Sequence, residues 1–267
     1  MEGSSIAYCA LIRTCNSEAT ISATLASLAA QTCPPAHYIF VDSGSTDGTL
    51  GFLPHGSILH RYEGPTFNYS EAINQGLQYV DTDYVLIISS HTSLSDKHAI
   101  SLAMRLLADD QSIGAAYFSN EPSQTAQYTL IDHRSFNGFN GMWNTCALIR
   151  TSLLRKRRFR PEVFSAEDQE WANWLFEKER KRVARISGAG MEYNNPVPYS
   201  LRKRLNEHVA IALFVRPEML RWRYIARVAY RAIRPVSTLR ERRFNAHLAI
   251  ALIGRRLPAI RSAARRS

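Results

Sequence analysis

The stretch VDSGSTDGT, residues 41–49, decides how the rest of the chain is interpreted. The apolar run 37–41 predicts a strand that ends at Asp42, and small hydroxyl-bearing residues and glycines follow it. An aspartate at a strand end can accept hydrogen bonds from a ribose or a nucleobase, while serine and glycine let a ligand approach the backbone. The same residues also fit an ordinary polar turn in which Ser45 or Asp47 caps a helix. The stretch by itself leaves a nucleotide site and a capped turn both open.

Strands and helices are predicted to alternate around this stretch. The predicted strands are residues 6–13, 37–41, 57–62, 84–88 and 113–118, with further strands at 128–132 and 145–149. The first predicted helix begins at the N-cap residues 16–18. Further helices are predicted over residues 70–80, 96–107 and 166–179. This β-α-β-α order predicts an α/β fold with a mostly parallel sheet and helices on both faces. In such sheets ligands bind beyond the carboxyl ends of the strands.

Charge is distributed unevenly over the 267 residues, whose net charge is +10. Residues 1–200 contain 16 Lys and Arg against 20 Asp and Glu, a net charge of −4. Residues 201–267 contain 17 against 3, a net charge of +14. A basic tail on a mildly acidic body is typical of a segment that meets an anionic surface, either a membrane or a nucleic acid.

The apolar runs and the cysteines indicate the compartment. The longest apolar runs, 209–215 and 248–253, are far shorter than the roughly 18 residues that a membrane-spanning helix needs. The N-terminus lacks a basic segment followed by an apolar one, so we expect no signal peptide. The four cysteines have no metal-ligand spacing and are expected to be reduced thiols. We therefore expect a cytoplasmic protein.

Residues 12–16, IRTCN, followed by VDSGSTDGT, resemble the opening of family 2 glycosyltransferases, which have the GT-A fold. In that family this strand-loop and the aspartate after the second strand hold the nucleoside of a nucleoside-diphosphate-sugar donor. The resemblance therefore implies a donor-binding set of Thr14, Asn16, Asp42, Ser43 and Ser45.

Residues 67–76, FNYSEAINQG, resemble the A-R-N-x-G helix of the same family. Asn74 matches and is assigned to the donor, whereas Ile73 stands where arginine is common, which removes a contact to the donor phosphate. The segment also fits an amphipathic helix with Ala72 and Leu77 on the core side, and we expect both roles together.

Residues 85–92, VLIISSHT, occupy the place of the family's D-x-D segment, whose carboxylates hold a metal that bridges the donor phosphates. Both carboxylates are missing, and Ser89 and His91 stand in their places. Ser89 is assigned to the donor. His91 is expected either to ligate a divalent metal, Mn²⁺ or Mg²⁺, or to contact the diphosphate as an imidazolium. A structural histidine at a strand end is the alternative.

Residues 159–171, FRPEVFSAEDQEW, resemble the family's region that carries the catalytic base. An inverting transfer needs a carboxylate that takes the proton of the acceptor hydroxyl. The resemblance implies that this base is Asp168, and adjacent Glu167 is expected to modulate its basicity by like-charge repulsion. The alternative is that both are helix N-terminal carboxylates favoured by the helix dipole.

Two further segments carry expectations about the acceptor. Trp143 and Asn144 lie where the family places acceptor-contacting residues, and Trp143 would stack on a sugar ring, although a core tryptophan fits equally. Residues 189–194 lack the histidine that many relatives carry after this helix, so a further metal or phosphate ligand is missing there.

The basic tail has two helical faces between residues 218 and 234. Four arginines share one face, namely Arg223, Arg227, Arg231 and Arg234. The apolar residues on the other face are Met219, Trp222, Ala226, Ala229 and Ile233. A second segment, 240–256, brackets an apolar run with arginines. This pattern is typical of helices lying in an anionic membrane interface. Packing on the catalytic domain and binding of nucleic acid are the alternatives.

Together these features predict a GT-A domain over residues 1–200, with a donor half of about 1–95 and an acceptor and catalytic half of about 96–200. Residues 201–267 are predicted to form a basic helical extension. We expect an inverting glycosyltransferase that acts on a saccharide or lipid-linked acceptor in surface polysaccharide or glycolipid biosynthesis, as a peripheral protein at the cytoplasmic face of the membrane.

Two other functions stay open. The missing D-x-D and Ile73 fit a catalytically inactive protein that only binds nucleotide-sugars. The basic tail fits a nucleic-acid-binding protein, although the tail has few aromatic residues and the chain has no nucleic-acid motif.

Overall fold

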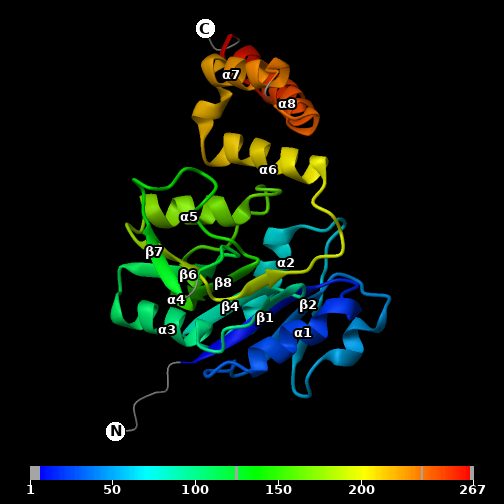
Figure 1. Ribbon diagram of the computed structural model, residues 1–267, viewed down its shortest axis with the longest axis vertical. Helices are drawn as coiled ribbons and strands as arrows, with labels where there is room; N and C mark the ends of the chain where they lie inside the picture. Colours follow the sequence, from blue (N-terminus) through cyan, green and yellow to red (C-terminus); the bar gives the residue numbers. More distant parts are fainter. Residues whose placement is uncertain (1–6, 124–125, 236, 265–267) are drawn as a thin grey trace. The chain divides into compact units, whose positions relative to one another are not determined.

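The computed structural model of the protein describes residues 7–123, 126–235 and 237–264, and side chains as far as residue 256 (Figure 1). The chain divides into two compact units. The first comprises the residues up to 162 together with 167–197, and the second comprises 163–166 with the residues from 198 onward.

The first unit is built on an eight-stranded sheet. In sheet order its strands are β3 (Ile58–Arg61), β2 (Tyr38–Asp42), β1 (Tyr8–Thr14), β4 (Tyr84–Ser89), β8 (Cys146–Arg150), β6 (Ile113–Phe118), β9 (Arg182–Ser187) and β7 (Gln127–Ile131). Strands β8 and β7 run antiparallel to their neighbours, and the other six run in one direction. The mostly parallel sheet that the sequence predicts is therefore confirmed.

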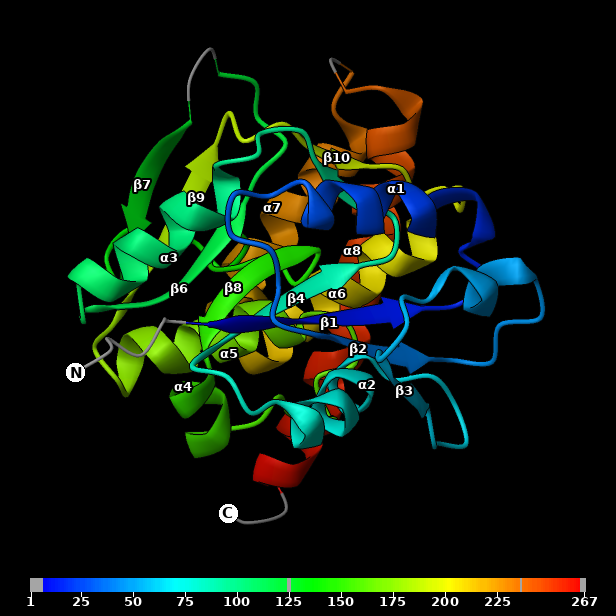
Figure 2. The same ribbon diagram turned by 90° about the horizontal axis from the view of Figure 1, so that it is seen from below.

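Helices cover both faces of this sheet, as Figure 2 shows. On one face lie α1 (Glu18–Ala29) and α3 (Ala99–Asp109). On the other lie α2 (Tyr69–Gly76), α4 (Thr151–Lys156) and α5 (Glu167–Glu177). The central strands consist almost wholly of apolar residues because both of their faces are buried. In β1, Ala10 and Ile12 enter one core while Cys9 and Leu11 enter the other.

The sequence patterns do not predict several elements of the first unit. Strand β9 carries arginines at 182 and 185, which hide its apolar positions, yet it pairs with both β6 and β7 inside the sheet. Two three-residue strands, β5 (Thr92–Leu94) and β10 (Met191–Tyr193), form a separate antiparallel pair. Two short 3₁₀ helices, η1 (Gly48–Phe52) and η2 (Leu77–Tyr79), complete the unit.

The second unit is helical. It contains α6 (Leu201–Phe214), the 3₁₀ helix η3 (Pro217–Leu220), α7 (Trp222–Ile233) and α8 (Leu239–Ala264). In α7 the buried side chains are Ile225 and Val228. The predicted apolar face of this region is divided, because Met219 is buried within η3 whereas its four other members lie exposed on α7.

Two further findings concern the helices and the cysteines. Within the described residues, no helix is long and apolar enough to cross a membrane. All four cysteines are free thiols, and Cys9 and Cys146 are buried.

Candidate functional site

The carboxyl ends of three neighbouring strands bring three predicted donor-binding residues to one edge of the sheet. Thr14 ends β1 and lies directly opposite Asp42, which ends β2. On the other side of β1, Ser89 at the end of β4 lies opposite Arg13. The hydroxyl Oγ1 of Thr14 is buried and has no hydrogen-bond partner among the described residues. This edge is where ligands bind in parallel α/β sheets.

Asp42 organises the turn that follows β2. Its carboxylate is fully buried and accepts the backbone N–H of Gly44 at 3.1 Å, the N–H of Ser45 at 3.1 Å and the hydroxyl of Ser45. Gly44 has a φ of 91°, a left-handed conformation that favours glycine. Asp47 caps η1 by accepting the N–H of Thr49 at 3.0 Å. Locally, then, this stretch is the capped polar turn that the sequence also allows.

The turn after β2 is tied to the loop after β1. Asn16 has a φ of 47° and accepts the N–H of Thr46 at 2.8 Å, while its own N–H donates to the hydroxyl of Ser45 at 3.0 Å. The N–H of Ser43 donates to the carbonyl of Thr14 at 3.0 Å. A non-glycine residue held in the left-handed region stores strain, which is frequent at ligand sites. These bonds fix both loops in one arrangement at the strand ends.

Asn74 is committed to a structural contact. Its Nδ2 donates to the carbonyl oxygen of Phe159 at 2.7 Å, and its Oδ1 accepts the N–H of the same residue at 3.1 Å. Ile73 is fully buried in the core. A Cβ on Gly76 would lie 2.8 Å from the side chains of Leu11 and Val41, so glycine lets α2 approach the sheet closely. The matching Asn and Gly of this helix therefore position α2, and both ends of the Asn74 side-chain amide contact the backbone of Phe159.

The two predicted catalytic carboxylates lie at the start of α5, where they meet the loop before β8. Asp168 accepts the backbone N–H of Asn144 at 3.3 Å. Glu167, which is 7% exposed, accepts the Asn144 side-chain amide at 3.3 Å. Asp168 is the less buried of the two. A base must be within reach of its substrate, so this difference favours Asp168 over Glu167.

Two residues of the same helix turn hold that arrangement, and the sequence patterns do not identify them. The Gln169 amide accepts the N–H of Gly141 at 2.8 Å and donates to the carbonyl of Met142 at 2.5 Å. Glu170 accepts two hydrogen bonds from one nitrogen of Arg157, at 2.6 and 2.8 Å. The sequence feature that could have indicated this supporting role is the run of polar side chains next to the predicted base; their burial is visible only in the structure.

Trp143 packs partly into the core and is partly exposed. Its ring packs against Tyr117 with centroids 5.3 Å apart and its Nε1 donates to the carbonyl of Phe139 at 3.4 Å. The side chain is nevertheless only half-buried. Burial, with a smaller contribution from Asp168, raises the pKa of Tyr117 to about 12, so this phenol is neutral at physiological pH. Trp143 thus keeps part of its ring available beside the Asn144 loop.

His91 lies just beyond β4, half-buried between α1 and β10. Its Nδ1 is 2.8 Å from the hydroxyl of Thr20, and its ring meets that of Tyr193 edge-on with centroids 6.4 Å apart. Burial lowers the pKa of His91, so the neutral imidazole predominates at pH 7. The described residues contain no group of three or more His, Cys, Asp or Glu side chains that would hold a metal ion.

Arg13 is a residue of this edge that the sequence patterns do not single out. Its guanidinium donates to the carbonyl of Asn144 at 2.9 Å and lies 5.3 Å from the ring centroid of Tyr69. Its Nε is buried without a hydrogen-bond partner among the described residues. Arginine binds phosphate strongly, so the position of this basic residue directly before Thr14 is the sequence feature that could have indicated its role.

Comparison with known proteins places this geometry in a family. The profile of Glycosyl transferase family 2 matches residues 9–159. No curated protein sequence matches the chain significantly.

Solved structures share the fold at low sequence identity. S. aureus TarS 1-349 has a TM-score of 0.61 at 17% identity, covering 92% of this chain and 80% of its own. The mannosyltransferase PcManGT from Pyrobaculum calidifontis, in complex with GDP-Man and Mn²⁺, has a TM-score of 0.62 at 17% identity, with coverages of 94% and 86%. Glucosyl-3-phosphoglycerate synthase from Mycobacterium tuberculosis, with Mn²⁺, UDP and phosphoglyceric acid, has a TM-score of 0.59 at 15% identity, with coverages of 77% and 76%.

Proposed function

Because this chain belongs to glycosyl transferase family 2, we propose that it moves a sugar from a nucleoside-diphosphate-sugar to an acceptor hydroxyl with inversion at the anomeric carbon. One observation carries the proposal. Asn144 lies between the guanidinium of Arg13 and the carboxylate of Asp168. A cation at the strand ends and a carboxylate base are thereby held around one residue, as the departure of a diphosphate and the activation of a hydroxyl require.

In this proposal the nucleoside lies against the loops that follow β1 and β2, which hydrogen bonds hold together. Thr14 contributes its buried hydroxyl, which has no hydrogen-bond partner among the described residues, while Asn16, Ser43 and Ser45 shape the loop wall. Asp42 acts mainly by holding the turn, because its carboxylate already accepts three local hydrogen bonds. The donor half of the site therefore depends on the conformation of the loop as much as on direct contacts.

Asp168 serves as the base. It takes the proton of the acceptor hydroxyl as that oxygen bonds to the anomeric carbon and the bond from that carbon to the nucleoside diphosphate breaks. The half-buried ring of Trp143 is placed to stack on the acceptor sugar, and Asn144 is placed to contact it. Glu167 holds Asn144 rather than the substrate.

The leaving diphosphate gains negative charge that a cation must offset. Arg13 is suited to this, because its Nε is buried without a hydrogen-bond partner among the described residues and the residue pairs with Ser89 in the register of β1 and β4. His91 is neutral at pH 7 and so contributes a nitrogen ligand or a hydrogen bond rather than a charge. Any divalent ion would be held by His91 and the donor together, since the described residues supply no multi-ligand centre.

The second unit is proposed to attach the enzyme to an anionic membrane. On α7 the apolar side chains of Trp222 and Ile233 are 49% and 69% exposed, and Ala226 and Ala229 between them are also exposed. These positions share one helix face, and exposed arginines flank them. An apolar stripe bordered by arginines suits the boundary of an anionic bilayer. We propose a peripheral cytoplasmic enzyme that glycosylates a lipid-linked saccharide or a growing surface polysaccharide.

The test is a panel of UDP-, GDP- and dTDP-sugars incubated with the purified full chain, with and without saccharide acceptors. Release of nucleoside diphosphate that depends on one donor and rises with an acceptor supports the proposal. The Asp168→Asn variant provides the background rate. Binding of a donor without any turnover, with every acceptor tested, would instead indicate an inactive nucleotide-sugar-binding protein.

A further inference from the structure

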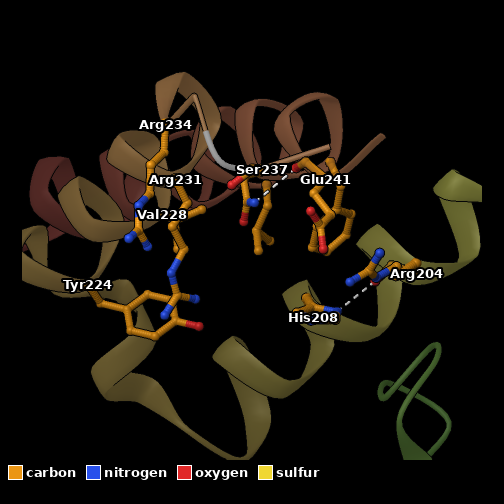
Figure 3. Close-up of a pocket in the computed structure, with 11 residues that line it drawn as sticks. Arg204, His208, Tyr224, Val228, Arg231, Arg234, Ser237 and Glu241 are labelled. Carbon is orange, nitrogen blue, oxygen red and sulfur yellow. Dashed lines mark hydrogen bonds between the residues drawn. The ribbon is translucent and has the colours of Figure 1, made fainter. Parts of the chain in front are cut away.

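The second unit contains a pocket of about 320 Å³ that the proposed transfer does not use (Figure 3). This volume is at the lower end of the range for small-ligand sites, about 300 to 1,000 Å³. The residues that line it come from α6, α7, α8 and positions 234 and 237 between α7 and α8, so the whole pocket belongs to the second unit. Its position within one compact unit makes it a site in its own right.

Three arginines line this pocket from two sides. Arg204 of α6 is held there by Phe244, whose ring centroid is 3.9 Å from the guanidinium carbon. Arg231 lies at the end of α7 and Arg234 directly follows that helix, and Figure 3 shows Arg231 extending toward Tyr224. Within the described part of the chain, none of the three forms a salt bridge. None of the three guanidinium groups is therefore held in an ion pair by a described carboxylate.

The carboxylate of the pocket has another role. Glu241 accepts the N–H of Thr238 at 2.9 Å and its hydroxyl at 3.0 Å, while the Glu241 N–H donates to the Thr238 hydroxyl at 3.2 Å. This reciprocal pair is a capping box that starts α8. The hydrogen bonds from Thr238 lower the pKa of Glu241, so it stays ionised. Three arginines against one carboxylate leave the pocket with an excess of two positive charges.

The remaining walls are suited to a small polar anion. The Nδ1–H of His208 donates to the carbonyl of Arg204 at 2.9 Å, and burial lowers the pKa of His208, so the ring adds no charge and offers Nε2 only as an acceptor. Burial raises the pKa of Tyr224, which therefore keeps its hydroxyl proton. Val228 and Leu248 are buried and give the pocket an apolar part of its lining. The arginines and the phenol are hydrogen-bond donors of the kind that phosphate oxygens accept.

We infer that this pocket binds the phosphate group of a small ligand, separately from the donor site. The face of α7 that lines the pocket, Tyr224, Val228 and Arg231, is opposite the exposed stripe of Trp222, Ala226, Ala229 and Ile233. If that stripe lies on a membrane, α7 lies between the lipid surface and the pocket. This arrangement favours a water-soluble phosphorylated molecule over a phospholipid headgroup as the source of the phosphate.

The test uses the full chain and inorganic phosphate, measured by calorimetry at low salt. In the variant Arg231→Gln/Arg234→Gln, phosphate affinity should fall about tenfold or more, because two charged hydrogen-bond donors are lost. The matched control is Arg223→Gln/Arg255→Gln, which removes the same charge from exposed positions outside the pocket. The control should bind phosphate like the parent, and so should Asp42→Ala, which alters the donor site. Circular dichroism verifies that each variant is folded.

A second arm identifies the source of the phosphate. Flotation with phosphatidylcholine vesicles containing phosphatidic acid should be weakened equally by the two double variants if the ligand is soluble. Selective loss in the pocket variant, together with selective loss of phosphate binding, assigns the phosphate to a lipid. Equal phosphate affinity in the two double variants, whether reduced or unchanged, would overturn the pocket assignment. None of these readouts depends on glycosyl transfer, so they stand whether or not the proposed reaction is correct.

Discussion

Arg13 at the end of β1 donates a hydrogen bond from its guanidinium to the carbonyl oxygen of Asn144, at 2.9 Å and across 131 residues of sequence. Asn144 in turn contacts both Glu167 and Asp168. The contact links the strand edge proposed for the donor to the loop proposed for the acceptor. Because the Arg13 Nε has no protein partner among the described residues, a bound phosphate would complete its hydrogen bonding.

Replacing Arg13 by methionine should lower kcat by about 10²–10³, the usual effect of removing one donor that stabilises developing negative charge. Affinity for the free nucleoside should change little, because the guanidinium faces the diphosphate in this proposal. Steady-state kinetics and nucleoside binding separate the two effects. A normal kcat in the methionine variant would exclude Arg13 from the leaving-group site.

Asp168→Asn should reduce turnover by about 10²–10⁴ while donor binding is preserved, because asparagine keeps the shape and cannot take a proton. Glu170→Gln is the matched control on the same helix turn. Loss of the Glu170 carboxylate weakens the contact with Arg157, so this variant should lower the unfolding temperature more than the rate of transfer. Retention of most of the turnover by the Asp168 variant would shift the search for the base to Glu167.

Asp42→Ala should lower the free energy of unfolding by about 1–3 kcal/mol and weaken donor binding at the same time. The reason is that a buried carboxylate with three local donors is removed, leaving those donors unpaired. Asp47→Ala, which removes the exposed cap of η1, is the comparison. Calorimetry and thermal unfolding of both variants are required. Equal losses of donor affinity would mean that only loop integrity matters and that Asp42 has no specific role.

The pH profile tests the role of His91. Burial lowers its pKa, so a role for the neutral ring requires activity to persist through pH 6.5 and to fall only at lower pH, as the imidazole becomes protonated. A role for the imidazolium predicts the reverse, a decline as pH rises toward 7. Activity should be measured with and without chelator for the parent and His91→Ala. If the alanine variant matches the parent under every condition, the residue is structural, held by Thr20 and Tyr193.

Binding to anionic vesicles should depend on the exposed stripe of α7. The variant Trp222→Ser/Ile233→Ser should float less with anionic liposomes than the parent, because buried apolar area supplies much of the binding free energy. Ile250→Ser, at an exposed position of α8, is the control. Binding should also weaken with salt, since charges are screened over about 8 Å at physiological ionic strength. Flotation that is unaffected by the stripe variant would remove α7 from the membrane contact.

The sequence by itself determined the fold class. Continuous apolar strands such as 84–88, separated by helical spacings, leave few alternatives to a mostly parallel sheet, because burial on both faces requires such runs. Local turn chemistry narrowed the cap to Ser45 or Asp47, since a cap depends on neighbours two residues away, and in the structure Asp47 caps η1. Strand β9 was not predictable for two reasons. Its arginines interrupt the apolar pattern, and its pairing partners β6 and β7 are distant in sequence.

Only the tertiary structure decided how the polar residues of the site are used. Asn74 and Asp42 match a family pattern for donor binding, yet their hydrogen bonds to Phe159 and to the turn could not be read from spacing. The same holds for Arg13, whose partner Asn144 is 131 residues away. A sequence motif fixes which groups are present, whereas a hydrogen bond depends on distances between segments that only packing brings together.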